Sequence, residues 1–257
     1  MKKHKICKIL LVILAIFLCV AFYELLGICV AYKKQPEVSN TTKKETKNGS
    51  WNECSENTER AVIIEKNPEA LLQRVRLIKN AKKEIILSTF AFQSDESGKL
   101  ILGALHDAAD RGVHIRLLVD GMESWIDMEG NPYFYGLSSH ENVEIKLYNK
   151  ANPLKPWKMM GRMHDKYLIA DGKRYILGGR NTYNYFLGDF PGHKNYDRDV
   201  LVVCDEPEKE NSVNQLLEYF ETIWEQEDSD YFHDNKKLAN RKSVKNAVLE
   251  LKNGYQK

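Results

Sequence analysis

The chain contains, at residues 164–181, the stretch HDKYLIADGKRYILGGRN. It fits the pattern H-x-K-x4-D-x6-G-G-x-N, whose fixed positions are His164, Lys166, Asp171, Gly178, Gly179 and Asn181. These residue types suit cleavage of a phosphodiester, because an imidazole can attack phosphorus, an ammonium can hold the non-bridging oxygens and an amide can donate hydrogen bonds. Such chemistry requires neither a metal ion nor another cofactor, and we expect none.

The local chain geometry directs these side chains toward one point. Asp171 opens a turn between two predicted strands, residues 167–170 and 174–177. Alternation along the first strand places His164 and Lys166 on the same side, where both can meet one phosphate. The glycine pair that follows permits close approach of the backbone to a phosphate.

The pattern resembles the motif of the phospholipase D superfamily, whose members usually carry it twice. The resemblance extends over about residues 67–226. This part of the chain is similar to the first half of bacterial cardiolipin-synthase-like proteins. The further matching stretches are EIILSTFAFQ at 84–93, GKLILGAL at 98–105, AADRGVHIRLLVD at 108–120, GGRNTYNYF at 178–186 and DRDVLVV at 197–203. The H-x-K-x4-D motif occurs only once in this chain.

The resemblance implies a phospholipase D-type phosphodiesterase or phosphatidyltransferase that acts on membrane glycerophospholipids through a phosphohistidine. Its activity would be that of a phospholipase D or of a cardiolipin synthase. Because one motif supplies one His, we expect a homodimer in which a second His164 completes the active site. The alternative is an inactive half of a split two-motif enzyme.

The resemblance also implies roles for individual residues. His164 is expected to be the nucleophile or its general-acid counterpart, and Asp171 to shape the site. The residues expected to bind the phosphate are Gly178, Gly179, Lys166 and Asn181. Relatives place a carboxylate after the Asn to orient the His, and we expect Asp199 in that role, with Asp197 as the alternative.

The N-terminus is predicted to anchor the protein in a membrane. Residues 1–8 are basic and would stay in the cytoplasm, and the apolar run 9–32 is long enough to cross the hydrocarbon core as a helix. This predicts a single-pass protein of the cell membrane with an extracytoplasmic catalytic part. The alternative is a cleaved signal peptide and a secreted protein.

The rest of the chain divides into three predicted parts. Residues 33–58 are rich in polar residues and are predicted to be a flexible linker, and residues 227–257 a polar C-terminal tail. Residues 59–226 alternate helix and strand signals, which predicts an α/β layered domain with a mixed, mostly parallel sheet flanked by helices. The strands expected there are 84–92, 113–119, 143–148, 167–170, 174–177 and 199–203. Three helices are expected: one that begins at Asn67, one over 97–111 and one over 208–226.

The residues just before the motif combine basic, aromatic and sulfur-containing side chains. Lys155, Trp157, Lys158 and Arg162 are candidates for contact with a membrane or a lipid headgroup, although an ordinary loop would have the same composition. A formal net charge of +2 disfavours a surface built throughout for nucleic acid. A membrane-tethered or secreted nuclease of the same superfamily is nevertheless the alternative function, and only under it would nucleic acid be a partner.

Overall fold

The computed structural model describes residues 2–33, 38–48, 59–205, 211–233 and 236–255. The chain divides into two compact units. The N-terminal unit consists of Met1–Ser55 and Ala151–Gly161, and the sheet unit consists of Glu56–Lys150 and Arg162–Lys257.

The sheet unit is built on a mixed eight-stranded sheet with the order β1-β7-β6-β5-β2-β3-β4-β8 among the described residues. The strands are β1 (Glu59–Ile64), β2 (Glu84–Thr89), β3 (His114–Asp120), β4 (Val143–Tyr148), β5 (Tyr167–Ala170), β6 (Arg174–Gly178), β7 (Asp199–Cys204) and β8 (Ser229–Tyr231). Among the described strands, only the β2–β3 and β3–β4 pairs are parallel. The prediction of a mixed sheet is confirmed, but its mostly parallel character is wrong.

The antiparallel half of the sheet starts from the predicted hairpin. β5 and β6 pair antiparallel, and the turn between them places Asp171 at φ 54° and Gly172 at φ 61°. Asp and Gly tolerate this left-handed conformation better than other residues do. β7 then pairs with β6, and β1 with β7, both antiparallel. β1 has no counterpart among the predicted strands.

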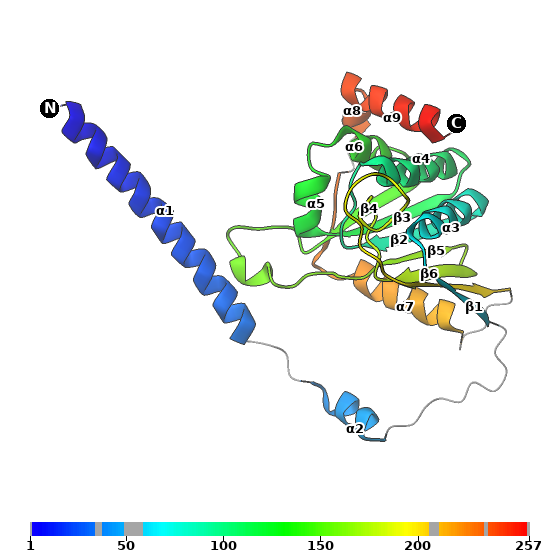
Figure 1. Ribbon diagram of the computed structural model, residues 1–257. Helices are drawn as coiled ribbons and strands as arrows, with labels where there is room; N and C mark the ends of the chain where they lie inside the picture. The colour runs from blue at the N-terminus through cyan, green and yellow to red at the C-terminus, as the bar shows by residue number, and fades with distance from the viewer. Residues whose placement is uncertain (1, 34–37, 49–58, 206–210, 234–235, 256–257) are drawn as a thin grey trace. The chain divides into compact units, whose positions relative to one another are not determined.

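Helices cover both faces of this sheet (Figure 1). They are α3 (Asn67–Asn80), α4 (Glu96–Asp110), α5 (Gly121–Asp127), α6 (Pro132–Ser138), α7 (Ser212–Trp224), α8 (Lys236–Ala239) and α9 (Lys242–Tyr255). One hydrophobic cluster joins α3, α4, α6 and α9 to one face, and a second joins α7 to the other. Successive strand residues alternate between them, since Ile85 and Leu87 belong to the first cluster and Ile86 to the second.

The C-terminal residues, expected to form a polar tail, are part of the sheet unit. α9 presents Val244, Ala247 and Leu251 at helical spacing, and all three are buried. Glycines allow its close packing: a Cβ on Gly136 of α6 would lie 2.5 Å from Val248, and one on Gly103 of α4 would lie 3.0 Å from Tyr255. The spacing of the three apolar positions indicates a helix over residues 243–251, but the polar average of the segment gives no sign that this helix packs on the sheet unit.

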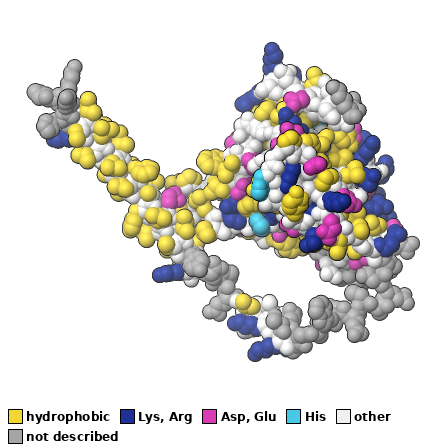
Figure 2. Space-filling model, in the orientation of Figure 1, with side chains coloured by type: hydrophobic (Ala, Val, Ile, Leu, Met, Phe, Trp, Pro, Cys, Tyr) yellow, Lys and Arg dark blue, Asp and Glu magenta, His cyan; other side chains and the backbone are white. Residues whose placement is uncertain are grey.

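The N-terminal unit contains the long helix α1 (Lys2–Lys33), the short helix α2 (Asn40–Asn48) and the 3₁₀ turn η1 (Pro156–Lys158). Within α1, Lys5–Ala31 is apolar and long enough to cross a membrane, with a mean hydropathy of 2.9. Apolar side chains cover most of this helix (Figure 2). α2 falls in the predicted flexible linker, and its first turn is capped by Ser39, whose hydroxyl accepts from the backbone amide of Thr42 at 3.0 Å.

Candidate active site

The catalytic pattern lies where β5 begins, next to the end of β2. The ring of Phe90, just after β2, contacts three alternate residues of the approaching chain. Its centroid lies 4.6 Å from the His164 ring, 4.9 Å from Cζ of Arg162 and 5.3 Å from Nζ of Lys166. The three residues therefore share one side of the chain, in agreement with the expected alternation. Sequence inspection missed Phe90, which is one apolar residue in a strand-like run.

Lys166 combines a buried stem with an ammonium beside the exposed His164. Its side chain is buried, and Nζ donates to the carbonyl oxygen of His164 at 2.7 Å. Burial lowers the pKa of Lys166, and the carboxylates of Asp165 and Asp197 partly oppose that change. A cation that water solvates poorly interacts strongly with an incoming phosphate.

Asp165, between these two residues, points the other way. Its carboxylate accepts from the hydroxyl of Tyr219 on α7 at 2.7 Å. Burial, reinforced by this hydrogen bond, raises the pKa of Tyr219 to about 12. Tyr219 therefore stays protonated at neutral pH and holds Asp165 away from the side of the chain that carries His164.

The glycine pair and Asn181 form the neighbouring part of the site. The side-chain oxygen of the buried Asn181 accepts from the backbone amide of Ala91 at 3.3 Å. A Cβ on Gly178 would lie 2.0 Å from Oδ1 of Asp199, and one on Gly179 would lie 1.9 Å from Oδ2 of Asp197. The glycines were expected to admit a phosphate, and in the structure they admit two carboxylates.

Asp171 lies at the opposite end of β5 from Lys166. Its carboxylate accepts from three successive backbone amides: 2.9 Å from Lys82, 2.7 Å from Lys83 and 3.1 Å from Glu84. These bonds fix the hairpin turn to the start of β2. Asp171 therefore shapes the sheet at the end of β5 that lies away from His164 and Lys166.

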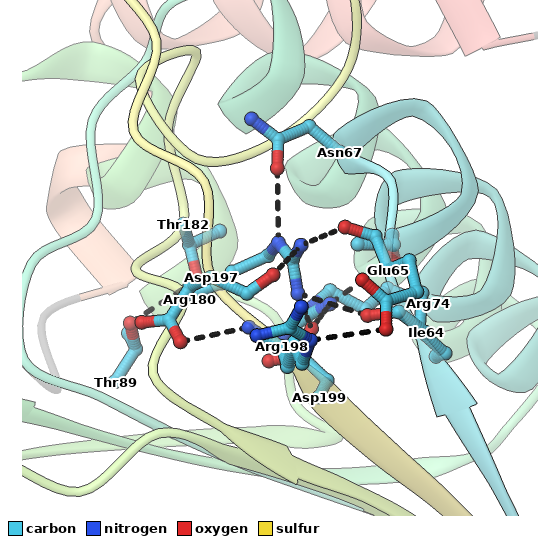
Figure 3. A network of polar contacts seen from close by, with 11 residues as sticks. Ile64, Glu65, Asn67, Arg74, Thr89, Arg180, Thr182, Asp197, Arg198 and Asp199 are labelled. Atoms are coloured by element: carbon cyan, nitrogen blue, oxygen red, sulfur yellow. Dashed lines mark hydrogen bonds and ion pairs between the residues drawn. The ribbon is translucent and has the colours of Figure 1, made fainter.

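Asp199 has different partners from those expected of an orienting carboxylate (Figure 3). Its fully buried side chain lies 2.9 Å from a guanidinium nitrogen of Arg74 and 3.2 Å from one of Arg180, both through Oδ2. Oδ1 has no hydrogen-bond partner among the described residues. Among the described residues, Asp199 makes no hydrogen bond or ion pair with His164, and its ion-pair partners are Arg74 and Arg180.

Arg180 occupies the variable position of the G-G-x-N motif and is among the largest fully buried side chains. It donates to the side chain of Asn67 at 3.1 Å and to the carbonyl oxygens of Glu65, at 2.7 Å, and Asp197 (Figure 3). Arg180 thus holds the start of α3 and the chain before β7 in place. Its place in the pattern gave no signal of this role. Asn67, the first residue of α3 as predicted, accepts from this guanidinium.

Asp197, the alternative orienting residue, is an exposed carboxylate whose charge acts on Lys166. It lies against Gly179. Its negative charge favours the charged form of Lys166 and so raises the pKa of Lys166, whereas burial lowers it. Its Oδ1 accepts from the backbone amide of Arg198 at 2.7 Å. Among the described residues, neither carboxylate bonds to His164, and Asp197 is the one whose charge acts on Lys166.

Arg162, a candidate for contact with lipid headgroups, has partners within the sheet unit. Its guanidinium donates to Asp120 at 2.9 Å and to Glu123 at 2.8 Å while it stacks on Phe90. Asp120 also accepts from the backbone amide of Met163 at 3.0 Å. These bonds make Arg162 a clamp on the chain that leads to His164. The other three candidates, Lys155, Trp157 and Lys158, belong to the N-terminal unit.

Comparison with known proteins identifies the family. A family model described as the PLD-like domain of cardiolipin synthase matches residues 74–224, more than half of the chain. This chain belongs to the cardiolipin synthase-type, phospholipase D-like family. The matched residues run from α3 to the end of α7 and include every catalytic candidate named above.

Curated relatives of the family are longer than this chain. An uncharacterized protein of Helicobacter pylori strain J99 is 30% identical over 212 residues, which cover 77% of this chain and 39% of that protein. Cardiolipin synthase C of Escherichia coli is 29% identical over 171 residues, 61% of this chain and 34% of the enzyme. The chain thus matches only about a third to two fifths of each of these relatives.

Solved structures share the fold at low sequence identity. NucT from Helicobacter pylori is 16% identical with a TM-score of 0.52, and the match covers 68% of this chain and 99% of that one. Phosphatidylserine synthase of Haemophilus influenzae is 18% identical with a TM-score of 0.54, over 76% of this chain and 43% of that one. These structures support the phospholipase D-like fold.

Proposed function

We propose that this protein is a phosphodiesterase or phosphatidyltransferase that acts on membrane glycerophospholipids through a phosphohistidine at His164. The observation that carries the proposal is the pairing of an exposed imidazole with the desolvated ammonium of Lys166 on one side of Phe90. An exposed nucleophile next to a preorganised cation suits a bulky phosphodiester that must be approached from outside.

The reaction has two displacement steps. The imidazole of His164 attacks phosphorus, the phosphorus–oxygen bond to the leaving alkoxide breaks, and a second imidazole donates a proton to that alkoxide. The second imidazole then removes a proton from water or from an alcohol, whose oxygen attacks phosphorus and releases His164. Water gives hydrolysis, and an alcohol gives phosphatidyl transfer.

Nearby side chains support the two steps. Lys166 holds the non-bridging oxygens, because its charge faces the site and its burial limits competition from water. Asn181 donates through its amide nitrogen, since its oxygen is bonded to Ala91. Asp197 orients His164 and stabilises its cationic form when a proton is transferred.

A second copy of the chain supplies the second imidazole. The motif provides one His, whereas protonation of the leaving group and attack on phosphorus require two. In a symmetric dimer, His164 of one copy attacks phosphorus and His164 of the other protonates the leaving group, because a two-fold axis places the two imidazoles on opposite sides of one phosphate. The active site is therefore proposed to be shared between two chains.

The apolar helix α1 is proposed to anchor the protein in the cell membrane. Its span Lys5–Ala31 has the length and hydropathy of a membrane-crossing helix, and lysines precede it. With the N-terminus in the cytoplasm, the sheet unit lies on the extracytoplasmic side. Its substrates are then the glycerophospholipids of the outer surface of that membrane.

Substrate preference distinguishes this proposal from a nuclease of the same family. The full-length protein is expected to turn over phosphatidylglycerol in vesicles at least about tenfold faster than it cleaves single-stranded DNA, and its rate on vesicles should resist EDTA, since no step uses a metal ion. Lipid products are measured by mass spectrometry and DNA by gel assay. Rapid cleavage of DNA with inert vesicles would replace the lipid substrate by nucleic acid.

A further inference from the structure

The loop Ala151–Gly161, which precedes the catalytic pattern, packs on the C-terminal third of α1 within the N-terminal unit. The hydroxyl of Tyr23 donates to the carbonyl oxygen of Leu154 at 2.9 Å. Pro156 lies against Gly27, where a Cβ would be 2.4 Å from Cγ of the proline. Gly27 is accordingly buried on a helix whose other faces are exposed.

The position of this contact along α1 sets its depth in a bilayer. Gly27 lies four residues before Ala31, the end of the membrane-crossing span. At about 1.5 Å per residue, the contact is about 6 Å inside the end of that span. A loop packed there meets the boundary between the acyl chains and the headgroups.

The side chains that the loop leaves exposed suit that boundary. Leu154 is 78% exposed, Met160 52% and Trp157 44%. Leu and Met gain free energy when they leave water, and Trp concentrates at membrane interfaces. The exposed Lys155 can bury its aliphatic stem while its ammonium meets anionic headgroups.

From these contacts we infer that residues 151–161 form a membrane-interface element, docked on the anchor helix, whose partner is the anionic surface of the bilayer. The inference rests on the proposed role of α1 as an uncleaved anchor. It adds a second attachment to the membrane, next in the chain to the catalytic motif.

This element limits how far His164 can move from the lipid headgroups. His164 follows Gly161 by three residues, so their Cα atoms are at most about 11 Å apart, at 3.8 Å per residue. By contrast, a flexible chain of 26 residues, the length of the predicted linker, has a root-mean-square span of roughly 28 Å. The clamp of Arg162 on Asp120 and Glu123 further restricts this short connection. The connecting chain thereby keeps the nucleophile within about 11 Å of the end of this element.

Gly27→Leu tests the inference, because any side chain at this position must displace Pro156. The control is Val30→Leu, which places the same side chain at an exposed position of the same helix. Both full-length variants are placed in nanodiscs with phosphatidylglycerol, and amide hydrogen exchange is followed at residues 154–161. We expect exchange there to accelerate about tenfold in Gly27→Leu and to stay at the wild-type rate in Val30→Leu.

Lipid contact is measured separately from loop packing. Leu154→Asp is expected to lower turnover on anionic vesicles at least about fivefold, with the rate on a soluble phosphodiester unchanged, whereas Leu249→Asp on α9 changes neither. Unchanged vesicle turnover in Leu154→Asp, or equal exchange in the two α1 variants, overturns the inference. If instead the amides of α1 exchange freely in nanodiscs, the anchor itself is wrong and the inference fails with it.

Discussion

Replacing His164 by alanine is expected to lower kcat at least about a thousandfold, because alanine has no nucleophilic atom that could form the covalent intermediate. Lys166→Ala should cause a loss of similar size, since it removes the cation that faces the phosphate. His164 is exposed, so the melting temperature of His164→Ala should equal that of the wild type. Turnover of vesicle lipid and thermal unfolding are the two measurements.

His193→Ala is the matched control for this experiment. His193 is also exposed and also contacts an aromatic ring, that of Tyr185 at 4.8 Å between centroids, but it lies outside the motif. We expect it to keep nearly full activity. A His164→Ala protein with more than about a tenth of the wild-type rate, or an equal loss in His193→Ala, would refute the assignment of the nucleophile.

Asp199→Asn is expected to lower the free energy of unfolding of the sheet unit by about 3–5 kcal/mol, because it leaves the guanidinium groups of Arg74 and Arg180 buried without a counter-charge. Removing one partner of a buried ion pair exposes the full desolvation cost of the other. The two Arg side chains also tie α3 and the chain before β7 to the site, so activity falls together with stability.

Asp197→Asn provides the contrast. Its carboxylate lies against Gly179 near Lys166, and its loss should lower kcat at least about a hundredfold with little change in stability. Urea unfolding measures the free energy of unfolding of each variant, and turnover of vesicle lipid measures its kcat. If Asp199→Asn unfolded like the wild type and lost only turnover, the orienting role would return to Asp199.

The sequence predicts those features of the fold that short stretches specify. The hairpin around Asp171 is confirmed at the predicted residues, because the Asp-Gly turn fixes it locally. β4 is found at the predicted residues, and α3, α4, β3 and β7 within one or a few residues of their predicted ends. The shared side of His164 and Lys166 follows from strand alternation in the same way.

Contacts between distant segments could not be predicted from residue types alone. Asp199 and Asp197 are two residues apart in one strand region, and only the packing of Arg74 and Arg180 shows which carboxylate is used in the core. Arg162 looked like a free cation because Asp120, its partner, lies 42 residues earlier in the chain. The direction of a parallel or antiparallel pairing likewise depends on segments that the local pattern does not connect.

The number of phosphohistidines formed per chain tests the shared active site most directly. The full-length protein is mixed with excess phosphatidylglycerol, quenched at alkaline pH to preserve the phosphoramidate, and digested, and the modified peptide that contains His164 is quantified by mass spectrometry. Two chains around one phosphate can carry only one intermediate, so we expect labelling to approach about 0.5 per chain at saturation. Labelling that approached one per chain, in a protein that sediments as an active monomer, would contradict the dimeric site.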